Sequence, residues 1–399
     1  MSTTPDTTPE ATPRPPRGGS TRLSRRARWG VPAVAVIAVA GAIGVPLMSA
    51  DASPSLPAKT AGQLLADLAS AQARPFSGTV VETARLGFPA VPGETSNISP
   101  LSLLTGSHTV RVWYGGAQQT RLALVGDLAE SDLVRNGTDL WLWSSKDKTA
   151  QHVLLPAKTA QSDPAAQARR QALEGLTPAQ AAAQALAAVD PTTSVSVDGT
   201  ARVAGRAVYE LVLRPRDTRS LVSSVRLAVD SRTHVPLRVQ VFGSNHTDPA
   251  FETGFTTVTF TKPPASVFRF TAPPGTKVTT KDLTKDSSLS SESPESHAVA
   301  PGTGKKSLQG NGSEPRVIGT GWTSIVELTG VDLTGAARNE SAQALLRSLK
   351  PVSGAYGTGR VLKTSVLSVL VLDNGLAYIG AVPPSMLEAA ASAAATSAK

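Results

Sequence analysis

The sequence predicts an α+β fold built on a large, meandering antiparallel sheet. About ten short runs between residues 76 and 260 alternate apolar and polar side chains, with the period of two that is typical of strands. Around these strands, helical periodicity occurs at residues 61–73, which precede them, and at residues 164–190, which interrupt them. Because 40% of the 399 residues are hydrophobic, the chain can bury a core in two or three domains.

The elements follow one another in a simple order. A helix is predicted over residues 61–73, capped by Thr60 and ended near Pro75. Asn136-Gly137 predicts a tight hairpin between two of the strands, and Thr177-Pro178 predicts a helix start inside the interruption. Strands are predicted at 76–86, 109–114, 120–125, 133–137, 140–143, 151–155, 194–197, 207–213, 225–229, 235–241 and 254–260.

Alternation along these strands gives the sheet one apolar face and one face rich in Arg, Thr and Gln. The few predicted helices either fill the apolar face completely or leave a cavity for an apolar ligand. The residues predicted to line such a cavity are Val110, Val112, Leu122, Leu124, Tyr209, Leu211, Leu213, Leu227, Val239 and Val241.

The N-terminus predicts export. Residues 1–28 form a Thr/Pro/Arg-rich tail that is expected to be disordered and cytoplasmic. Residues 29–49 contain an uncharged run of eighteen residues, 31–48, which would span about 27 Å as a helix. The preceding Arg cluster places the N-terminus inside. We favour a retained single-pass anchor over a signal peptide cleaved before Ser53, with all that follows outside the cytoplasm.

The C-terminal third predicts a second, smaller unit. Residues 276–313 are biased toward Ser, Gly, Lys and Glu, which is typical of a flexible linker. Residues 314–399 predict a small α+β unit that packs on the main domain, because it is too small for a sizeable core of its own. Its predicted strands are 321–328, 359–364, 366–372 and 376–380, with a hairpin at Asn374-Gly375, a helix at 339–349 and a final helix from 383–385.

Three stretches together resemble a known superfamily. These are the helix at 61–73, the strand start at 76–80, and the final strand at 254–260 with its Phe-x-Phe-x-x-Pro-x-Gly ending at 268–275. Their order is similar to that of the LolA/LolB lipoprotein carriers, which include the MucB/RseB regulators of envelope stress. The resemblance covers residues 60–275. It implies a half-open β-barrel with helices on its concave side and a hydrophobic ligand held there.

Two departures limit what the resemblance implies. Lipoprotein carriers proper are soluble, whereas this chain is predicted to be tethered. The 26 Arg against 13 Lys, with many Ala, Gly and Pro residues, indicate a GC-rich genome such as that of an actinobacterium. The identity of the cargo therefore does not carry over. The additional C-terminal unit is closer in plan to the RseB type, which has a second small domain.

No pattern of catalytic or metal-binding residues emerges. The chain has no Cys, which excludes disulfides, zinc ribbons and thiol catalysis, and its five His are isolated. Asp127, Glu130 and Asp132 predict a solvated turn rather than a cation site. We therefore predict no enzyme activity, no cofactor and no metal. The net charge of +9 gives no basic stripe, since residues 1–30 hold six Arg against two acidic residues, and we predict no nucleic-acid partner.

Three tryptophans leave their role open. Trp113, Trp141 and Trp143 are suited either to packing or to contact with a lipid chain. Trp141 and Trp143 share one strand face, opposite Leu140 and Leu142, so one of these two pairs is expected to point inward.

The resulting hypothesis is an exported, membrane-tethered carrier that holds an acyl chain in a hydrophobic concavity. Its partners would be a lipid or acylated protein and the cell membrane, reached through the N-terminal helix. The alternative is an RseB-like regulator that binds an anti-sigma factor or another membrane protein.

Overall fold

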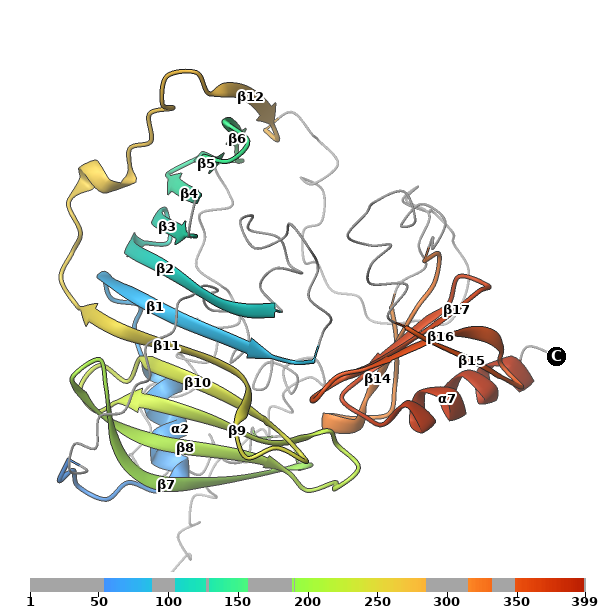
Figure 1. Ribbon diagram of the computed structural model, residues 1–399. Coiled ribbons are helices and arrows are strands. Elements are labelled where there is room, and N and C mark those ends of the chain that lie inside the picture. Colours follow the sequence, from blue (N-terminus) through green and yellow to red (C-terminus); the bar gives the residue numbers. More distant parts are fainter. Residues whose placement is uncertain are drawn as a thin grey trace, which may run out of the picture.

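The computed structural model describes residues 54–87, 105–126, 129–156, 189, 191–284, 315–331 and 349–397. Within these residues the chain forms a large, curved and open sheet of twelve strands and a separate sheet of six strands (Figure 1). The helices predicted at 164–190 and 339–349, apart from residues 189 and 349, lie outside the described residues, as do the tail and anchor before residue 50. No helix in the described part of the chain is long and apolar enough to span a bilayer.

The large sheet contains most of the predicted strands. In chain order its strands are β1 (Phe76–Arg85), β2 (Thr105–Gly116), β3 (Gln119–Val125), β4 (Glu130–Asn136), β5 (Asp139–Ser144), β6 (Thr149–Leu154), β7 (Thr193–Val203), β8 (Arg206–Pro215), β9 (Val222–Asp230), β10 (Pro236–Gly243), β11 (Pro249–Thr259) and β12 (Lys277–Asp282).

Two meanders make up this sheet. Strands β1 to β6 run in succession toward one edge, and strands β7 to β11 run from the opposite edge back to the middle. They join where β11 pairs antiparallel with β1, as Ser77 opposite Thr259 illustrates. We call β1–β6 the first meander and β7–β11 the second meander. The prediction of a large meandering antiparallel sheet is confirmed.

The last strand differs from the prediction. Residues 277–282, at the start of the predicted linker, form β12, which pairs parallel with the edge strand β6. The run Lys-Val-Thr-Thr-Lys-Asp contains β-branched residues at three successive positions, which favour an extended backbone. Its charged residues also suit an exposed edge. The linker boundary predicted at residue 276 is therefore wrong for these six residues.

Two predicted hairpins form where the sequence places them. Gly137 joins β4 to β5 with φ +66°, and Gly375 joins two strands of the small sheet with φ +84°. Positive φ is accessible to Gly at no steric cost, which explains both Asn-Gly pairs.

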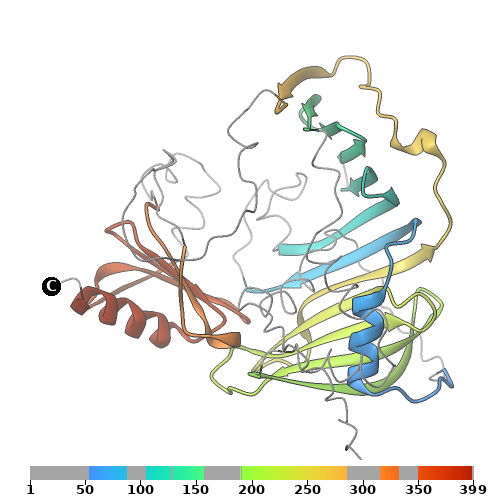
Figure 2. The ribbon, with the colours of Figure 1, turned by 180° about the vertical axis from the view of Figure 1, so that it is seen from behind.

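Helix α2 (Ala61–Ser70) packs against the second meander and is held at its start by a capping box (Figure 2). The Thr60 hydroxyl accepts a hydrogen bond from the Gln63 backbone N–H, and the Gln63 side chain accepts one from the Thr60 backbone N–H. Leu64 is completely buried against the sheet. The helix ends three residues earlier than predicted, at Ser70.

The small sheet has its own core. Its strands are β13 (Arg316–Ile318), β14 (Ile325–Leu328), β15 (Lys350–Gly354), β16 (Gly357–Lys363), β17 (Ser368–Leu372) and β18 (Ala377–Gly380), in the order β13-β14-β18-β17-β16-β15. Helix α7 (Pro384–Ser397) covers one face and buries Leu387 against Leu370 and Tyr378.

One predicted strand of this unit begins later than expected. Residues 321–323 form a 3-10 turn rather than the start of the strand predicted at 321–328. Gly321 has φ +65°, a conformation that interrupts an extended run, so β14 begins only at Ile325. The turn places Trp322 against the large sheet, where it joins the apolar cluster beneath α2.

The two sheets are in direct contact, as the sequence predicts. Val366, in the loop between β16 and β17, is buried in the apolar cluster of the second meander. The Ser365 backbone N–H donates to the Leu86 carbonyl at 3.0 Å, and the Leu221 backbone N–H donates to the Ala381 carbonyl at 2.8 Å. Backbone and side-chain contacts therefore fix the small unit against the end of the large sheet.

Candidate apolar ligand site

All ten residues predicted to line a ligand cavity lie on one face of the large sheet. Directly paired residues point to the same side, and the register connects Leu211, Leu227, Val239, Thr253 and Glu82 across neighbouring strands. Glu82 pairs with His108 in turn, which places the alternating residues of β2 and β3 on the same side. We call this side, against which α2 packs, the inner face.

The second meander's share of the inner face is filled. Tyr209, Leu211, Leu213 and Leu227 are buried in one cluster with Leu64 of α2. Val239 and Val241 are half-buried against the same cluster, as is Trp322 from the small unit. Side chains of helix α2 and of the small unit therefore cover the second meander's part of the inner face.

The part of the inner face that belongs to the first meander is more exposed toward strand β5. Val110, Val112 and Leu124 are buried in a second cluster, and Leu122 is half-buried against it.

From Val112 an apolar row continues across the register through Leu122 and Leu133 to Leu142. Exposure rises along this row, from 3% for Val112 to 39% for Leu142. We call these four residues the apolar row. It presents leucine side chains to the surface on the same face that is closed elsewhere.

A buried polar group separates the two halves of the inner face. Glu82 is 1% exposed and lies between His108 and Thr253 in the register, both of which are also buried. None of these three residues is among the predicted lining residues, because the prediction rested on the apolar positions of the alternation. The signal was present in β1, where Glu82 occupies the alternate position between Val80 and Ala84.

The tryptophans of β5 point to the other side, which we call the outer face. The rings of Trp141 and Trp143 contact the Phe270 ring, with centroid distances of 5.2 and 6.3 Å, while Leu142 lies on the inner face. Trp141 also stacks on His152 at 4.1 Å. Leucine rather than tryptophan is therefore the inward pair on this strand.

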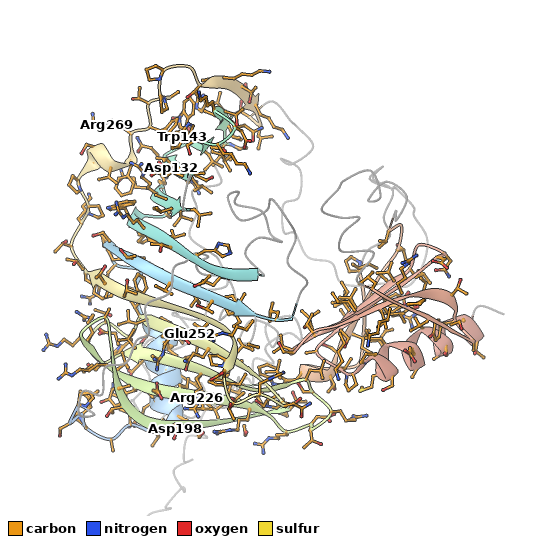
Figure 3. All side chains as sticks on the ribbon, in the orientation of Figure 1. Asp132, Trp143, Asp198, Arg226, Glu252 and Arg269 are labelled. Carbon is orange, nitrogen blue, oxygen red and sulfur yellow. The ribbon has the colours of Figure 1, made fainter. Side chains whose placement is uncertain are left out.

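Charged pairs occupy the outer face of the second meander. Arg226 lies 3.0 Å from Asp198 and 3.8 Å from Glu210, which also accepts a hydrogen bond from Arg238 (Figure 3). The polar face predicted from the alternation is thus confirmed as a set of cross-strand ion pairs.

Asp132 lies on the outer face in strand β4, so the solvated turn predicted for it is wrong. It is 3% exposed and pairs with Arg121, whose guanidinium lies 5.5 Å from the Trp113 ring. Burial raises the pKa of Asp132 above its ordinary value, even though Arg121 opposes that shift. Asp127 lies outside the described residues, and in the described part of the chain no three His, Asp or Glu side chains are placed to hold a metal.

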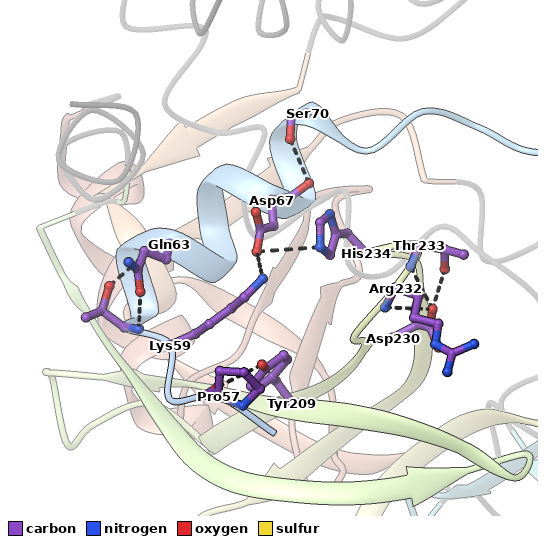
Figure 4. A network of polar contacts seen from close by, with 11 residues as sticks. Pro57, Lys59, Gln63, Asp67, Ser70, Tyr209, Asp230, Arg232, Thr233 and His234 are labelled. Atoms are coloured by element: carbon purple, nitrogen blue, oxygen red, sulfur yellow. Dashed lines mark hydrogen bonds and ion pairs between the residues drawn. The ribbon is translucent and has the colours of Figure 1, made fainter. Parts of the chain in front are cut away.

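A polar network anchors α2 to the second meander (Figure 4). Asp67 on the helix pairs with Lys59 at 2.6 Å and lies 3.7 Å from His234, in the loop between β9 and β10. The Tyr209 hydroxyl donates to the Pro57 carbonyl at 2.8 Å. These contacts hold the segment before α2, and the helix itself, over the apolar cluster.

The last residue of β9, next to this loop, is a second carboxylate with many partners. Asp230 is 1% exposed and receives two hydrogen bonds from Arg206, at 2.7 and 2.8 Å. It also accepts hydrogen bonds from the backbone N–H and the hydroxyl of Thr233. Burial alone would raise the pKa of Asp230, but the hydrogen bonds from Arg206 and Thr233 outweigh it, so the pKa lies below its ordinary value.

Neither of the two best-formed pockets among the described residues lies on the inner face. One, of about 250 Å³, lies between the two sheets, and the other, of about 430 Å³, lies at the turns that contain Gly116 and Gly137. None of the ten predicted lining residues borders either pocket.

Comparison with known proteins identifies the architecture. Residues 157–266, which include the whole second meander, match the family model of the MucB/RseB N-terminal domain. The chain therefore contains a stretch similar to the MucB/RseB N-terminal domain over these residues. The resemblance to the LolA-like and MucB/RseB-like superfamily drawn from the sequence is confirmed. Among curated proteins the search finds no match to this MucB/RseB-like chain.

Solved structures show similarity of modest extent. The complex of Pseudomonas aeruginosa MucA and MucB has 17% identity and a TM-score of 0.39, with 83% of this chain and 96% of that chain covered. A LolA superfamily protein from Nitrosomonas europaea has 12% identity and a TM-score of 0.19, with 53% of this chain and 99% of that chain covered.

Proposed function

We propose that this MucB/RseB-like chain is a binding protein that holds an acyl chain, from a lipid or an acylated protein, on the apolar row of its inner face. The observation that carries this proposal is the rising exposure from Val112 to Leu142 on a face that is otherwise closed. Since α2 and the small unit already fill the second meander's half, the first meander offers the remaining apolar surface.

The binding energy would come from the removal of apolar surface from water. Each Å² contributes about 25 cal/mol, so burial of one acyl chain gives several kcal/mol without a directional bond. The row extends across four adjacent strands spaced about 4.8 Å apart, which suits an extended chain laid across the strands. No catalytic group is needed for this mechanism.

The cellular setting is part of the proposal. An N-terminal anchor at residues 29–49 would place the binding face outside the cytoplasm and near the membrane that supplies the ligand.

The test compares two single variants of the full chain. Leu142→Glu places a charge at the exposed end of the apolar row, whereas Val317→Glu places the same charge at a 50% exposed valine of the small sheet. Native mass spectrometry detects lipid that co-purifies, and the thermal midpoint is measured with and without added lysophospholipid. We expect the parent and Val317→Glu to bind lipid and gain stability, and Leu142→Glu to lose both effects. Equal behaviour of all three proteins, or no lipid on the parent, would overturn the proposal.

A second candidate is a regulator that binds a membrane protein, and the match to the MucB/RseB family model favours it. MucB is described in complex with MucA in the similar structures. Cross-linking of the full chain in cells would identify such a partner. A partner that Leu142→Glu retains, while lipid is lost, would separate regulation from carriage.

A further inference from the structure

The pocket between the two sheets is formed by segments that are far apart in the chain. Arg85, Leu86 and Gly87 come from the end of β1, His246 from the loop before β11, and Lys363 to Ser365 from the end of β16. The volume of about 250 Å³ is below the usual range for drug-sized ligands and suits a small group. Both sheets therefore contribute to one small recess.

The charge of this recess has one sign. Arg85, Lys363 and His246 are exposed on its rim, and none of its seven lining residues is acidic. Seven other basic side chains in the described residues do have a carboxylate partner, namely Arg121, Arg206, Arg219, Arg226, Arg238, Arg316 and Lys59. Within the same residues, no carboxylate pairs with the three basic side chains of the pocket. Arg85 and Lys363 therefore bring two positive charges without a carboxylate partner to one pocket at the junction of the two units.

We infer that this pocket binds a phosphate-class oxyanion. Arg85 presents a planar fork of donors suited to two phosphate oxygens, and Lys363 supplies a compact positive charge that lines the same pocket. A phosphate monoester has a charge of about −1.5 to −2 at pH 7, which these two residues match. A single carboxylate would leave one of the two positive charges uncompensated.

The pocket sits on a rigid frame. The Ser365 backbone N–H and hydroxyl both donate to β1, to the carbonyls of Leu86 at 3.0 Å and Arg85 at 3.4 Å. The Thr364 hydroxyl accepts the Leu367 backbone N–H at 3.0 Å, which fixes the loop beyond Lys363.

Gly243 completes the frame, since a Cβ there would lie 2.7 Å from the Ser365 carbonyl oxygen. An anion held by Arg85 and Lys363 would therefore connect the two units at a point where their backbones already touch. The inference does not depend on acyl-chain binding, because none of the apolar row borders the pocket.

The test measures phosphate binding by the full chain. Isothermal titration with inorganic phosphate, and the thermal midpoint in phosphate against chloride at equal pH and ionic strength, are compared among three proteins. Arg85→Gln/Lys363→Gln removes two charges from the pocket. Lys262→Gln/Arg269→Gln removes the same two residue types from the exposed segment between β11 and β12. The single variant Lys363→Glu, at an exposed position, keeps the experiment decisive if the pocket double variant does not fold.

The expected result is saturable phosphate binding by the parent and the control, and binding at least about tenfold weaker in both pocket variants. A second arm uses vesicles of phosphatidylcholine with and without phosphatidic acid. Binding to phosphatidic acid that requires Arg85 and Lys363, without response to inorganic phosphate, would assign the phosphate to a lipid headgroup. Phosphate and phosphatidic acid binding that is absent, or equal in all variants, would overturn the inference.

Discussion

The two meanders of the large sheet share one inner face but differ in how completely their side chains are buried and hydrogen-bonded. In the second meander Leu211 is fully buried beneath α2, and the Asp230 carboxylate has hydrogen bonds from both Arg206 and Thr233. In the first meander Leu142 is 39% exposed, and the Asp132 Oδ1 atom is buried without a hydrogen-bond partner among the described residues. The second meander is a completed core, whereas the first keeps apolar surface and an incompletely satisfied charge. This difference places the structural role in one half and the proposed ligand in the other.

Truncation of leucines should give the largest difference between the two meanders. Leu64→Ala removes a completely buried side chain between α2 and the second meander and should lower the free energy of unfolding by about 3 kcal/mol. Leu133→Ala, in the apolar row, removes a half-buried side chain and should cost less than about 1.5 kcal/mol. Denaturation of the full chain in urea, followed by circular dichroism, measures both.

The comparison would fail if the two substitutions cost the same. Added lysophospholipid should stabilise the parent and Leu64→Ala equally but stabilise Leu133→Ala less. The reason is that only Leu133→Ala alters the proposed ligand surface, and this result would strengthen the contrast between the two meanders.

Neutralising the two buried aspartates should give the next largest difference. Asp230→Asn removes the charge that Arg206 contacts twice and should destabilise the chain by about 2 kcal/mol at pH 7. Asp132→Asn should change stability by less than about 0.5 kcal/mol or increase it, because burial already opposes ionisation there. Urea denaturation at pH 7 distinguishes them, and a larger loss for Asp132→Asn would contradict the assignment.

The pH dependence of the parent follows from the same pair. The folded-state pKa of Asp230 is lowered, so its contribution to stability is present above the unfolded-state pKa of about 3.9 and is lost as the pH falls through the folded value. The pKa of Asp132 is raised, so its contribution has the opposite sign and is lost as the pH rises through its folded value. Asp230→Asn should therefore flatten the acid limb of the stability profile, and Asp132→Asn should leave that limb in place.

Much of this division was accessible from the sequence. Period-two alternation located the strands β1 to β11, and the ten lining residues do share one face, because alternation and register determine side-chain direction directly. The Asn-Gly pairs located two turns for a local reason, the positive φ of their glycines.

The features that could not be predicted from the sequence depend on contacts between distant segments of the chain. β12 was missed because a short, charged run forms a strand only when an edge such as β6 is available to pair with it. The buried Glu82 and the pocket of Arg85, His246 and Lys363 arise where strands far apart in the chain meet, and no local spacing encodes that. The filling of one half of the inner face depends on Val366 and Trp322, which come from the other unit.

The smallest predicted effect concerns the contact between Trp322 of the small unit and Thr193 of the second meander. The Trp322 Nε1–H donates to the hydroxyl of the buried Thr193 at 2.7 Å, and the ring packs on the apolar cluster. Trp322→Phe keeps most of the apolar contact and removes the donor, so the loss should be about 1 kcal/mol. In a double-mutant cycle, Thr193→Val should cost little more once Trp322→Phe is present. Additive losses would mean that the hydrogen bond contributes nothing and that ring packing alone holds the small unit against the sheet.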